Sequence, residues 1–487
     1  METIRRGSRG PLVARWQEFL ANQNLQNHPG AADGIFGAKT AAATREFQQR
    51  HGLVADGVVG PMTWAQAQAL GFGGGGVMII EANFEATAPN GTAYLSWAPR
   101  KLTLRLIDAQ GRNPATVRLS SLRAIPLQFA VARTADGQPT LDIDLPQDSS
   151  PAEVWISGVF GEASTEDGDS GYRINDLASG VELASQPAMV RIRKNANRLA
   201  DGERDRFLQA MADLNASGTG RFRDFRDMHV DAARIEAHFD VGFLPWHRSY
   251  LLDLERELQE IDPSVALPYW RFDEPAPQVF STDFMGLPNS VGRVIFEPGH
   301  PFESWVTDGQ LGLVRPMGFP PDARPPVIIS EADTLALEPE AGETKYRGFA
   351  EMEGNPHGIA HTRFSLGSFI RAIGTAARDP LFFMLHANVD RLWAKWQWLE
   401  RLRNPDDAQA FGTSDDNRVG HRLDDTMWPW NQIVTPPRPI SAPGGTLAPS
   451  PLTPRPGLSP MVRDMIDYQG ITAGDPLGFD YDDVPIE

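Results

Sequence analysis

The hydrophobic periodicity of the chain changes twice, and this feature limits most strongly the folds that the sequence can adopt. Apolar residues recur at helical spacing in residues 11–21 and 40–53, and again from about 195 to 430. Between them, four runs alternate apolar and polar residues, as half-buried strands do: residues 102–107, 141–145, 152–160 and 189–194. Because 487 residues are also too many for one core, we predict a multidomain α + β protein.

The run GFGGGG at residues 71–76 marks a domain boundary, because glycines without bulky neighbours form flexible linkers. We therefore expect a small three-helix domain over 1–70, the linker 71–76, and a β-sandwich-like domain over 77–193. A mainly helical domain with long loops then covers 194–487. Its Pro-rich segment 435–460 can form neither a helix nor a central strand, so we expect an extended strap along the surface.

Composition excludes several classes of site. The chain has no cysteine, which removes disulfides and thiolate ligands, so any metal must be held by His, Asp or Glu. A net charge of −18 argues against a nucleic-acid partner. The sequence shows neither a membrane-spanning apolar run nor the apolar core of a secretory signal. We therefore expect no membrane partner and a cytoplasmic location for the chain as given, with release or association with the cell envelope left open.

The histidines are unevenly placed. Of ten in the chain, six fall into two triplets in the helical part: His229, His238 and His247, then His357, His361 and His386. His357 and His361 are four residues apart, so a helix presents both from one face. His238 and His247 are nine apart and face opposite sides of a continuous helix, at about 100° per residue. They converge only if the chain breaks between them, for which Gly242 and Pro245 are candidates, with His247 opening a helix over 247–260.

A single histidine on an apolar face is usually a satisfied core residue, but two complete triplets favour metal binding. Neutral imidazoles without carboxylates or thiolates suit copper or zinc. One triplet would fit catalytic zinc with an open fourth position. Two triplets fit a pair of coupled copper ions better.

A short repeat near the N-terminus predicts turns followed by helices. DGIFGAKT at 33–40 recurs as DGVVGPMT at 56–63, where Asp-Gly supplies turn positions and Thr40 and Thr63 can cap the next helix. Residues 4–70 resemble the three-helix peptidoglycan-binding domain, with Trp16 where that family usually has leucine. The resemblance implies peptidoglycan as a partner.

Two longer motifs carry a second resemblance, which covers about 190–430. FDVGFLPWHRSYLLDLE followed by LPYW, and DPLFFMLHANVDRLWAKW, resemble the copper signatures of the tyrosinase, catechol oxidase and haemocyanin family. The resemblance implies a four-helix bundle with two copper ions. Copper A would lie on His229, His238 and His247, and copper B on His357, His361 and His386. The resemblance also implies oxidation of ortho-diphenols to ortho-quinones by dioxygen, with weak activity on monophenols left open.

The resemblance assigns further roles near these ligands. Glu353, four residues before His357, matches an acidic residue that orders a water, and we expect it to accept a phenol proton. Asp390 is expected either to support a ligand histidine or to form a salt bridge with Arg391 or Arg248.

The sequence also departs from the family pattern. Gly358 stands where enzymes that hydroxylate monophenols often have asparagine, so diphenol oxidation is the safer expectation. Leu385 replaces a second histidine beside His386, which puts the shape of the pocket in doubt. Without cysteine, the cysteine–histidine thioether of fungal and plant members cannot form.

Two other functions stay open: a haemocyanin-like dioxygen binder, and a peptidoglycan-binding protein whose copper domain is inactive. Some family members carry a domain that plugs the active site. In this chain the segment 77–193 or the strap 435–460 could act in that way.

Overall fold

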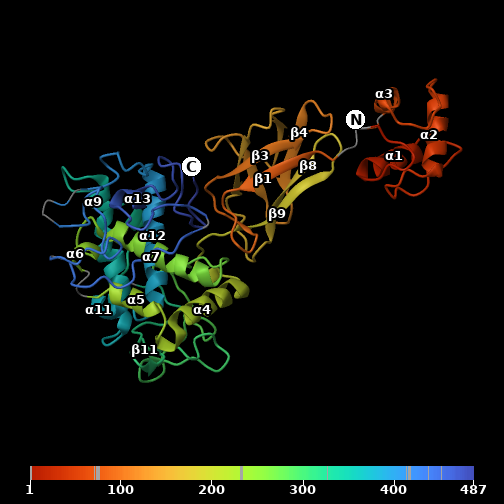
Figure 1. The fold of residues 1–487 in the computed structure, drawn as a ribbon. Helices are drawn as coiled ribbons and strands as arrows, with labels where there is room; N and C mark the ends of the chain where they lie inside the picture. Colours follow the sequence, from red (N-terminus) through yellow and green to blue (C-terminus); the bar gives the residue numbers. More distant parts are fainter. Residues whose placement is uncertain are drawn as a thin grey trace.

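The computed structural model describes residues 3–70, 72, 77–230, 234–325, 327–412, 414, 418–436, 438–450 and 452–486. Within these residues, the buried apolar side chains form three cores, which draw mainly on successive parts of the chain. Figure 1 shows the N-terminal helices at one end, a β-rich region in the middle and a larger, mainly helical region at the other end. The multidomain α + β prediction is confirmed at this level, whereas the domain boundaries stay predictions.

The N-terminal region consists of α1 (Pro11–Ala21), α2 (Ala38–Arg50) and α3 (Pro61–Ala69) around a buried indole. Trp16 is fully buried, and its ring centroid lies 5.2 Å from that of Trp64 and 5.5 Å from that of Phe47. Its Nε1 donates to Thr44 Oγ1 at 2.9 Å, so the polar atom of this large side chain is satisfied inside the core.

The predicted helix caps of the repeat are wrong. Both α2 and α3 begin after a glycine without a side-chain cap, and Thr40 and Thr63 lie inside the first turn. Their hydroxyls instead accept hydrogen bonds from the side-chain amides of Gln17, at 3.0 Å, and Gln48, at 3.1 Å. Each threonine therefore ties its helix to a neighbouring one rather than capping it.

Two sheets form the β-rich region and share one core. The first has the order β1-β3-β7-β5 and the second β2-β9-β8-β4-β6; only the β2–β9 pair is parallel. The strands are β1 (Ile79–Phe84), β2 (Ala93–Leu95), β3 (Arg100–Asp108), β4 (Ala115–Ser121), β5 (Leu127–Ala130), β6 (Thr140–Leu145), β7 (Ala152–Gly158), β8 (Ser170–Asp176) and β9 (Glu182–Val190). Each predicted alternating run overlaps one of these strands, because alternation places every second side chain in the shared core.

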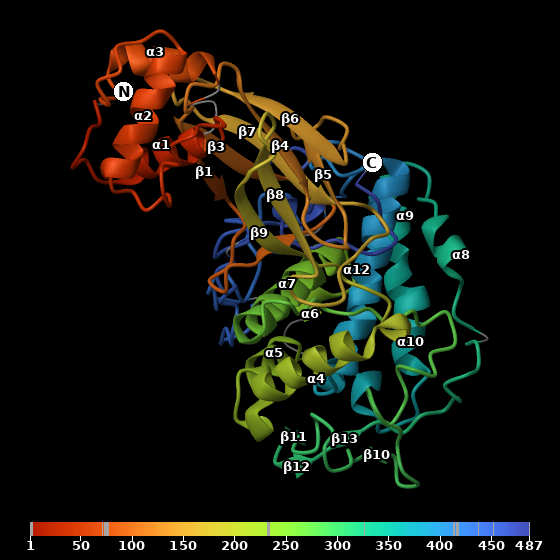
Figure 2. The same ribbon diagram turned by 90° about the vertical axis from the view of Figure 1, so that its right-hand side faces the viewer.

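The helical region is built around two long helices in contact, α7 (Phe243–Ile261) and α12 (Leu381–Glu400) (Figure 2). The other helices are α4 (Asp201–Asn215), α5 (Phe222–Met228), α6 (Arg234–Ala237), α8 (Glu331–Leu335), α9 (Lys345–Ala350), α10 (Ile359–Thr362), α11 (Ile373–Ala376) and α13 (Val462–Ile466). Short helical turns cover η1 (Ala196–Arg198), η2 (Ala216–Gly218), η4 (Glu351–Glu353), η5 (Gly354–Gly358) and η6 (Phe369–Arg371). Small strand pairs join β10 (Arg293–Val294) to β13 (Leu313–Val314) and β11 (Val306–Thr307) to β12 (Gln310–Leu311). Among the described residues, no helix has the length and apolar character needed to span a bilayer.

Helix α7 begins four residues earlier than predicted, so Pro245 does not break the chain. A proline in the first turn is tolerated because the amide hydrogen it lacks would have no partner within the helix. The break lies instead between α6 and α7, where Phe239 adopts a positive φ of 66°. The chain therefore does break between His238 and the helix that carries His247, as expected, but it breaks near Phe239 rather than at Gly242 or Pro245.

The Pro-rich strap 435–460 is not confined to the surface. It contains no helix among its described residues, as its composition predicts. However, Leu447 is buried in the helical core, while Leu452 is buried in the core of the β-rich region. Arg256 of α7 also donates to two carbonyl groups of the strap. The strap thus packs between the two regions, and the prediction of a surface segment is wrong.

Candidate metal centre

The six predicted ligands lie in two clusters. In each cluster, one possible ligand atom from every imidazole lies within 4.8 Å of the other two. The first cluster comprises His229, His238 and His247, and the second comprises His357, His361 and His386. All six side chains are buried, although their positions in the sequence span more than a hundred residues.

Different elements supply the members of each triad. In the first, His229 directly follows α5, His238 directly follows α6, and His247 lies near the start of α7. In the second, His357 belongs to the π-helical turn η5 and His361 to α10, while His386 lies on α12. The two long helices therefore each contribute one histidine, and short helices, turns and the residues that follow them contribute the others.

The Nε2 atoms of the imidazoles converge. His247 Nε2 lies 3.4 Å from His229 Nε2, and His386 Nε2 lies 3.3 Å from the Nε2 atoms of both His357 and His361. The triads also adjoin each other, because the rings of His247 and His386 stack with centroids 4.2 Å apart and planes 11° apart. The arrangement therefore fits two neighbouring metal ions rather than two distant ones.

Backbone carbonyl groups fix the tautomers of four of the histidines. Nδ1 of His247 lies 2.9 Å from the Phe243 carbonyl oxygen, and Nδ1 of His357 lies 2.8 Å from that of Glu353. The same contact joins His229 to Ile373 at 3.1 Å and His361 to Ile370 at 2.5 Å. Since a carbonyl oxygen only accepts, each Nδ1 carries the hydrogen and each Nε2 presents a lone pair to a metal.

The remaining two histidines differ in this respect. His238 and His386 have a buried Nδ1 without a hydrogen-bond partner in the described part of the chain. Leu385, the residue before His386 that departs from the family pattern, has a fully buried apolar side chain.

Burial keeps all six imidazoles neutral. Loss of solvent lowers the pKa of His229 to about 3, with the charge of His361 as a further cause, and burial lowers that of His361 to about 4. The pKa of each of the other four histidines is also well below its usual value, first through burial and then through neighbouring imidazoles. Two sets of three neutral nitrogen donors suit copper or zinc, so the residues fit a dicopper pair.

Asp390 holds the two long helices together. Its Oδ1 accepts from Arg248 Nε at 2.5 Å, and its Oδ2 accepts from Arg193 Nη1 at 3.1 Å and from the Tyr481 hydroxyl at 2.6 Å. All four side chains are almost completely buried. The predicted pairing with Arg248 is confirmed, and Asp390 lies at the contact between α7 and α12, the helices that carry His247 and His386.

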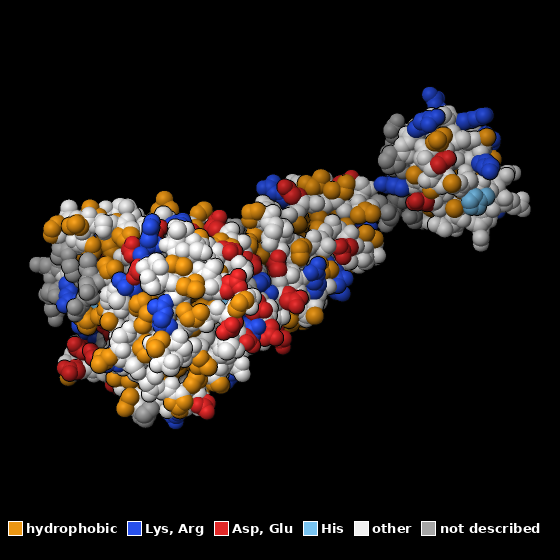
Figure 3. Space-filling model, turned by 90° about the horizontal axis from the view of Figure 1, so that it is seen from below, with side chains coloured by type: hydrophobic (Ala, Val, Ile, Leu, Met, Phe, Trp, Pro, Cys, Tyr) orange, Lys and Arg blue, Asp and Glu red, His pale blue; other side chains and the backbone are white. Residues whose placement is uncertain are grey.

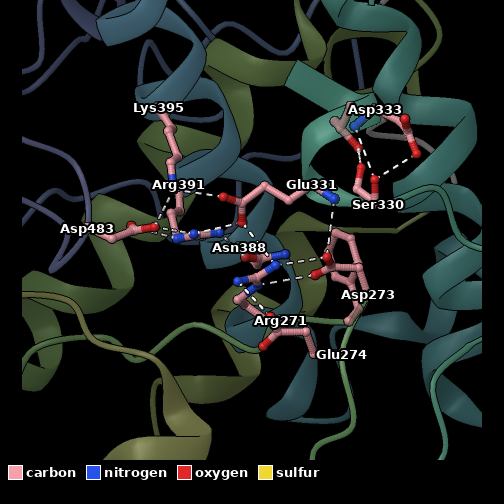
Figure 4. A network of polar contacts seen from close by, with 12 residues as sticks. Arg271, Asp273, Glu274, Ser330, Glu331, Asp333, Asn388, Arg391, Lys395 and Asp483 are labelled. Atoms are coloured by element: carbon pink, nitrogen blue, oxygen red, sulfur yellow. Dashed lines mark hydrogen bonds and ion pairs between the residues drawn. The ribbon is translucent and has the colours of Figure 1, made fainter. Parts of the chain in front are cut away.

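Arg391, the next residue on α12, contacts a different set of side chains, as Figure 4 shows. Its guanidinium contacts the carboxylates of Asp483, in the C-terminal segment, and of Glu331, in α8, the latter at 2.8 Å. Lys395, one turn further along α12, contacts the same two acids at 2.7 Å. The predicted alternative of an Arg391–Asp390 pair is therefore wrong, because the two side chains project from different faces of the helix.

A cavity of about 720 Å³ opens above the triads. In the described part of the chain, its lining comes from residues 229–241 and 347–376, including four of the histidines. Neither the segment 77–193 nor the strap contributes a described residue to it, so the expected cover is not observed in these segments.

Glu353 lines this cavity close to the second triad. Both of its carboxylate oxygens accept from the backbone amide of Phe239, at 2.8 and 3.0 Å. Burial raises its pKa to about 7, although the Phe239 hydrogen bond opposes the shift. A carboxyl group held in this way can take up a proton near neutral pH.

Comparisons with known proteins agree with the geometry. Residues 219–399 match the family model described as "Common central domain of tyrosinase", and residues 9–66 match "Putative peptidoglycan binding domain". Tyrosinase of Streptomyces antibioticus is 32% identical over 270 residues, which span 50% of this chain and 94% of that protein. The chain belongs to the tyrosinase family.

Further relatives include tyrosinase of Streptomyces glaucescens, 33% identical over 268 residues, 49% of this chain and 92% of that protein. Latent apple tyrosinase has a solved structure with a TM-score of 0.31 and 22% identity, covering 49% of this chain and 56% of its own. Tyrosinases are type-3 dicopper proteins, and the two histidine triads of this chain could bind two metal ions. The protein is thus an oxidoreductase of the tyrosinase and polyphenol oxidase type.

Some groups at this site gave no signal in the sequence. Phe239 lines the cavity, is 55% exposed, and orients Glu353 through its backbone amide. Ile370 and Ile373 support one ligand of each triad through backbone carbonyl groups, which no side-chain pattern reveals. His421, which lies outside both triplets, is buried and its Nδ1 accepts from the Gly242 amide at 3.2 Å, just before α7.

Proposed function

We propose that the protein uses dioxygen to oxidise ortho-diphenols to ortho-quinones. One copper ion would be held by His229, His238 and His247, and the other by His357, His361 and His386. The observation that carries this proposal is the convergence of two adjoining sets of neutral, buried imidazole nitrogens beneath an open cavity. When bound, the metal pair supplies the redox chemistry, the passage of two electrons from the diphenol to dioxygen.

The residues of the chain would position the substrate and manage its protons. Glu353 accepts a phenolic proton, because its carboxylate lines the cavity and is held by a single backbone amide. Removing that proton places negative charge on the phenol oxygen, which favours its approach to the metals. The buried rings around the triads keep bulk water from the ligand nitrogens.

Diphenols are favoured over monophenols because of Gly358. This residue lines the cavity next to His357 and has no side chain that could hold a water molecule or a phenol hydroxyl. A diphenol needs only to lose protons and electrons, whereas a monophenol must also gain an oxygen atom. We therefore propose ortho-diphenols as the main substrates.

The test is metal analysis together with turnover of 4-methylcatechol under air. We expect two copper ions per chain, quinone formation and consumption of dioxygen. His247→Gln and His386→Gln should each lose copper and activity, because each removes a ligand from one triad. His51→Gln, which changes a histidine of the N-terminal helices, serves as the matched control and should keep both. Reversible dioxygen binding without quinone would contradict the proposal and support the haemocyanin-like alternative.

We also propose that residues 1–70 form a peptidoglycan-binding unit joined to the catalytic part through 71–76, with the β-rich domain over 77–193 and the dicopper domain over 194–487. The family-model match to residues 9–66 supports this proposal. Full-length protein and a chain that starts at residue 77 should be compared in a pull-down on purified peptidoglycan. Retention of only the full-length chain is expected, and equal retention of both, or of neither, would contradict it.

A further inference from the structure

The cavity above the triads is larger than a diphenol ring requires. Its volume of about 720 Å³ lies in the range of pockets that hold drug-sized ligands, roughly 300–1,000 Å³. A substrate can therefore carry a substituent that reaches beyond the metals and contacts the cavity wall. The charged side chains of that wall then decide which substituents are accepted.

Arg371 occupies a defined place in this wall. The backbone on either side of it is tied to both triads, because His361 donates to the Ile370 carbonyl and His229 donates to the Ile373 carbonyl. Arg371 itself lines the cavity, as does the neighbouring residue Thr362. The backbone position of Arg371 relative to the triads is therefore fixed by hydrogen bonds from one histidine of each triad.

The guanidinium of Arg371 is anchored at one end only. Its Nη1 donates to the carbonyl oxygens of Thr362 and Phe364, and these two are its hydrogen bonds within the described part of the chain. No described acid forms an ion pair with it. The other arginine that lines the cavity, Arg347, differs because its Nη1 lies 3.7 Å from Asp240 Oδ1.

We propose that Arg371 binds a carboxylate group of the substrate, so that the preferred diphenols carry an ionised carboxylate on their side chain. This inference rests on the proposed function. The Nη2 and Nε hydrogens of the guanidinium supply the parallel donors that match a carboxylate, a geometry that lysine cannot reproduce. The carbonyl groups that hold Nη1 orient this fork before the substrate arrives.

Three acidic residues also line the cavity, and they affect whether a carboxylate or an amine on the substrate is preferred. Glu353 receives the Phe239 amide, and Asp240 faces Arg347 at 3.7 Å and Arg418 at 3.9 Å, so both have partners. Glu351 is exposed on the cavity wall and would favour an amine instead. A preference for an amine-bearing diphenol is thus the competing outcome.

The first experiment compares kcat/KM for 3-(3,4-dihydroxyphenyl)propionate, its methyl ester and 2-(3,4-dihydroxyphenyl)ethylamine. We expect the copper-loaded protein to favour the acid over the ester by about 10-fold, mainly through KM, as a charge-assisted hydrogen bond allows. Arg371→Gln should abolish this ratio and Arg371→Lys should retain part of it. Arg378→Gln, at a nearby arginine that pairs with Asp308 at 2.8 Å, should leave the ratio unchanged.

The second experiment separates Arg371 from the metals, since a carboxylate can also bind copper. Metal-free protein is titrated calorimetrically with 3-phenylpropionate and with its methyl ester. Tighter binding of the acid that disappears in Arg371→Gln supports the proposal. Equal binding of acid and ester, or a preference for the amine in turnover, overturns it. If no diphenol is oxidised at all, the proposed function fails, while this titration still tests the carboxylate site.

Discussion

At the residue scale, the candidate metal centre depends on where the histidines direct their Nδ1 atoms. Four imidazoles donate Nδ1–H to backbone carbonyl groups, which side-chain substitutions cannot remove directly. The tautomer that exposes Nε2 is therefore set by the fold. Other residues near the triads are then left to act on the substrate, and two of them can be tested by single substitutions.

Glu353→Gln should lower kcat for 4-methylcatechol by about 100-fold, because the amide keeps an oxygen for the Phe239 amide but cannot accept a proton. Copper content should stay at the wild-type value, since Glu353 supports His357 through its backbone carbonyl. Glu351→Gln changes a neighbouring acid of the same cavity and is the matched control, with a much smaller expected effect. Similar losses in both variants would remove the special role of Glu353.

Gly358→Asn should raise the ratio of monophenol to diphenol turnover about fivefold, the value of roughly one added hydrogen bond. A side chain at this position would point into a tight space, since its Cβ would meet the Glu353 carbonyl oxygen at 3.2 Å. Gly358→Ala has the same Cβ without the amide and serves as the control. The measurement is the initial rate with a monophenol and with its diphenol; an equal increase in both variants would argue against the amide.

At the element scale, α7 and α12 set the separation of the triads, since each helix carries one member of a different triad. Arg248 follows His247 on α7, and Asp390 lies one turn after His386 on α12. Their salt bridge, completed by Arg193 and Tyr481, locks the two helices where His247 and His386 stack.

Asp390→Asn should therefore destabilise the fold by roughly 3–5 kcal/mol, the cost of leaving a buried charge without its partner. Arg248 loses its acidic partner, whereas Arg193 retains Glu255 at 2.7 Å. We expect a lower melting temperature and weaker copper retention. Asp142→Asn, which breaks an exposed pair with Arg118 at 2.7 Å, should change the melting temperature little. Equal effects of the two substitutions would contradict a stabilising role of the Asp390–Arg248 salt bridge between α7 and α12.

The face of α12 that carries Arg391 and Lys395 should confer a pH-dependent stability through Asp483. Burial alone raises the pKa of this carboxyl group, but its hydrogen bond with Arg391 and the charges of Arg391 and Lys395 outweigh burial and lower the pKa to about 2. A lowered folded-state pKa stabilises the protein above the unfolded-state value of about 4, and this contribution is lost as the pH falls toward 2.

The measurement is the difference in melting temperature between the wild type and Asp483→Asn at several pH values. We expect the difference to be largest between pH 5 and 7 and to shrink steadily toward pH 2. A difference that does not depend on pH would show that the ionised carboxylate does not stabilise this face.

Some features of these elements could be predicted from the sequence and others could not, for physical reasons. The grouping of the six histidines into two clusters was predictable because spacing on helices and scarcity elsewhere both appear in the chain itself. The start of α7 was not, because Pro245 is compatible both with a break and with a first helical turn. The carbonyl supports of His229 and His361 were beyond prediction, since the former joins residues 144 positions apart through a backbone atom.

At the scale of the whole molecule, the three regions are joined to different degrees. Arg193, just after β9, reaches α7, α12 and the C-terminal Tyr481, so the β-rich region shares buried polar contacts with the catalytic part. The N-terminal helices contact the β-rich region through long hydrogen bonds from Arg15 to Gln110, at 3.4 and 3.5 Å.

Figure 3 shows that Lys and Arg side chains gather on part of the N-terminal surface. Residues 1–70 contain seven basic and five acidic residues, unlike the chain as a whole.

This organisation leads to an expectation about latency. Neither the β-rich region nor the described part of the strap lines the cavity, whose lining in the described chain comes from residues 229–241 and 347–376, although Arg438 of the strap pairs with Glu236 of α6. Cleavage in either segment should therefore expose no additional substrate path. The rate with 4-methylcatechol, measured before and after limited proteolysis, should stay constant or fall as the shared buried contacts are lost. A several-fold increase, with a cleavage site mapped to 77–193 or 435–460, would show instead that one of these segments covers the metals.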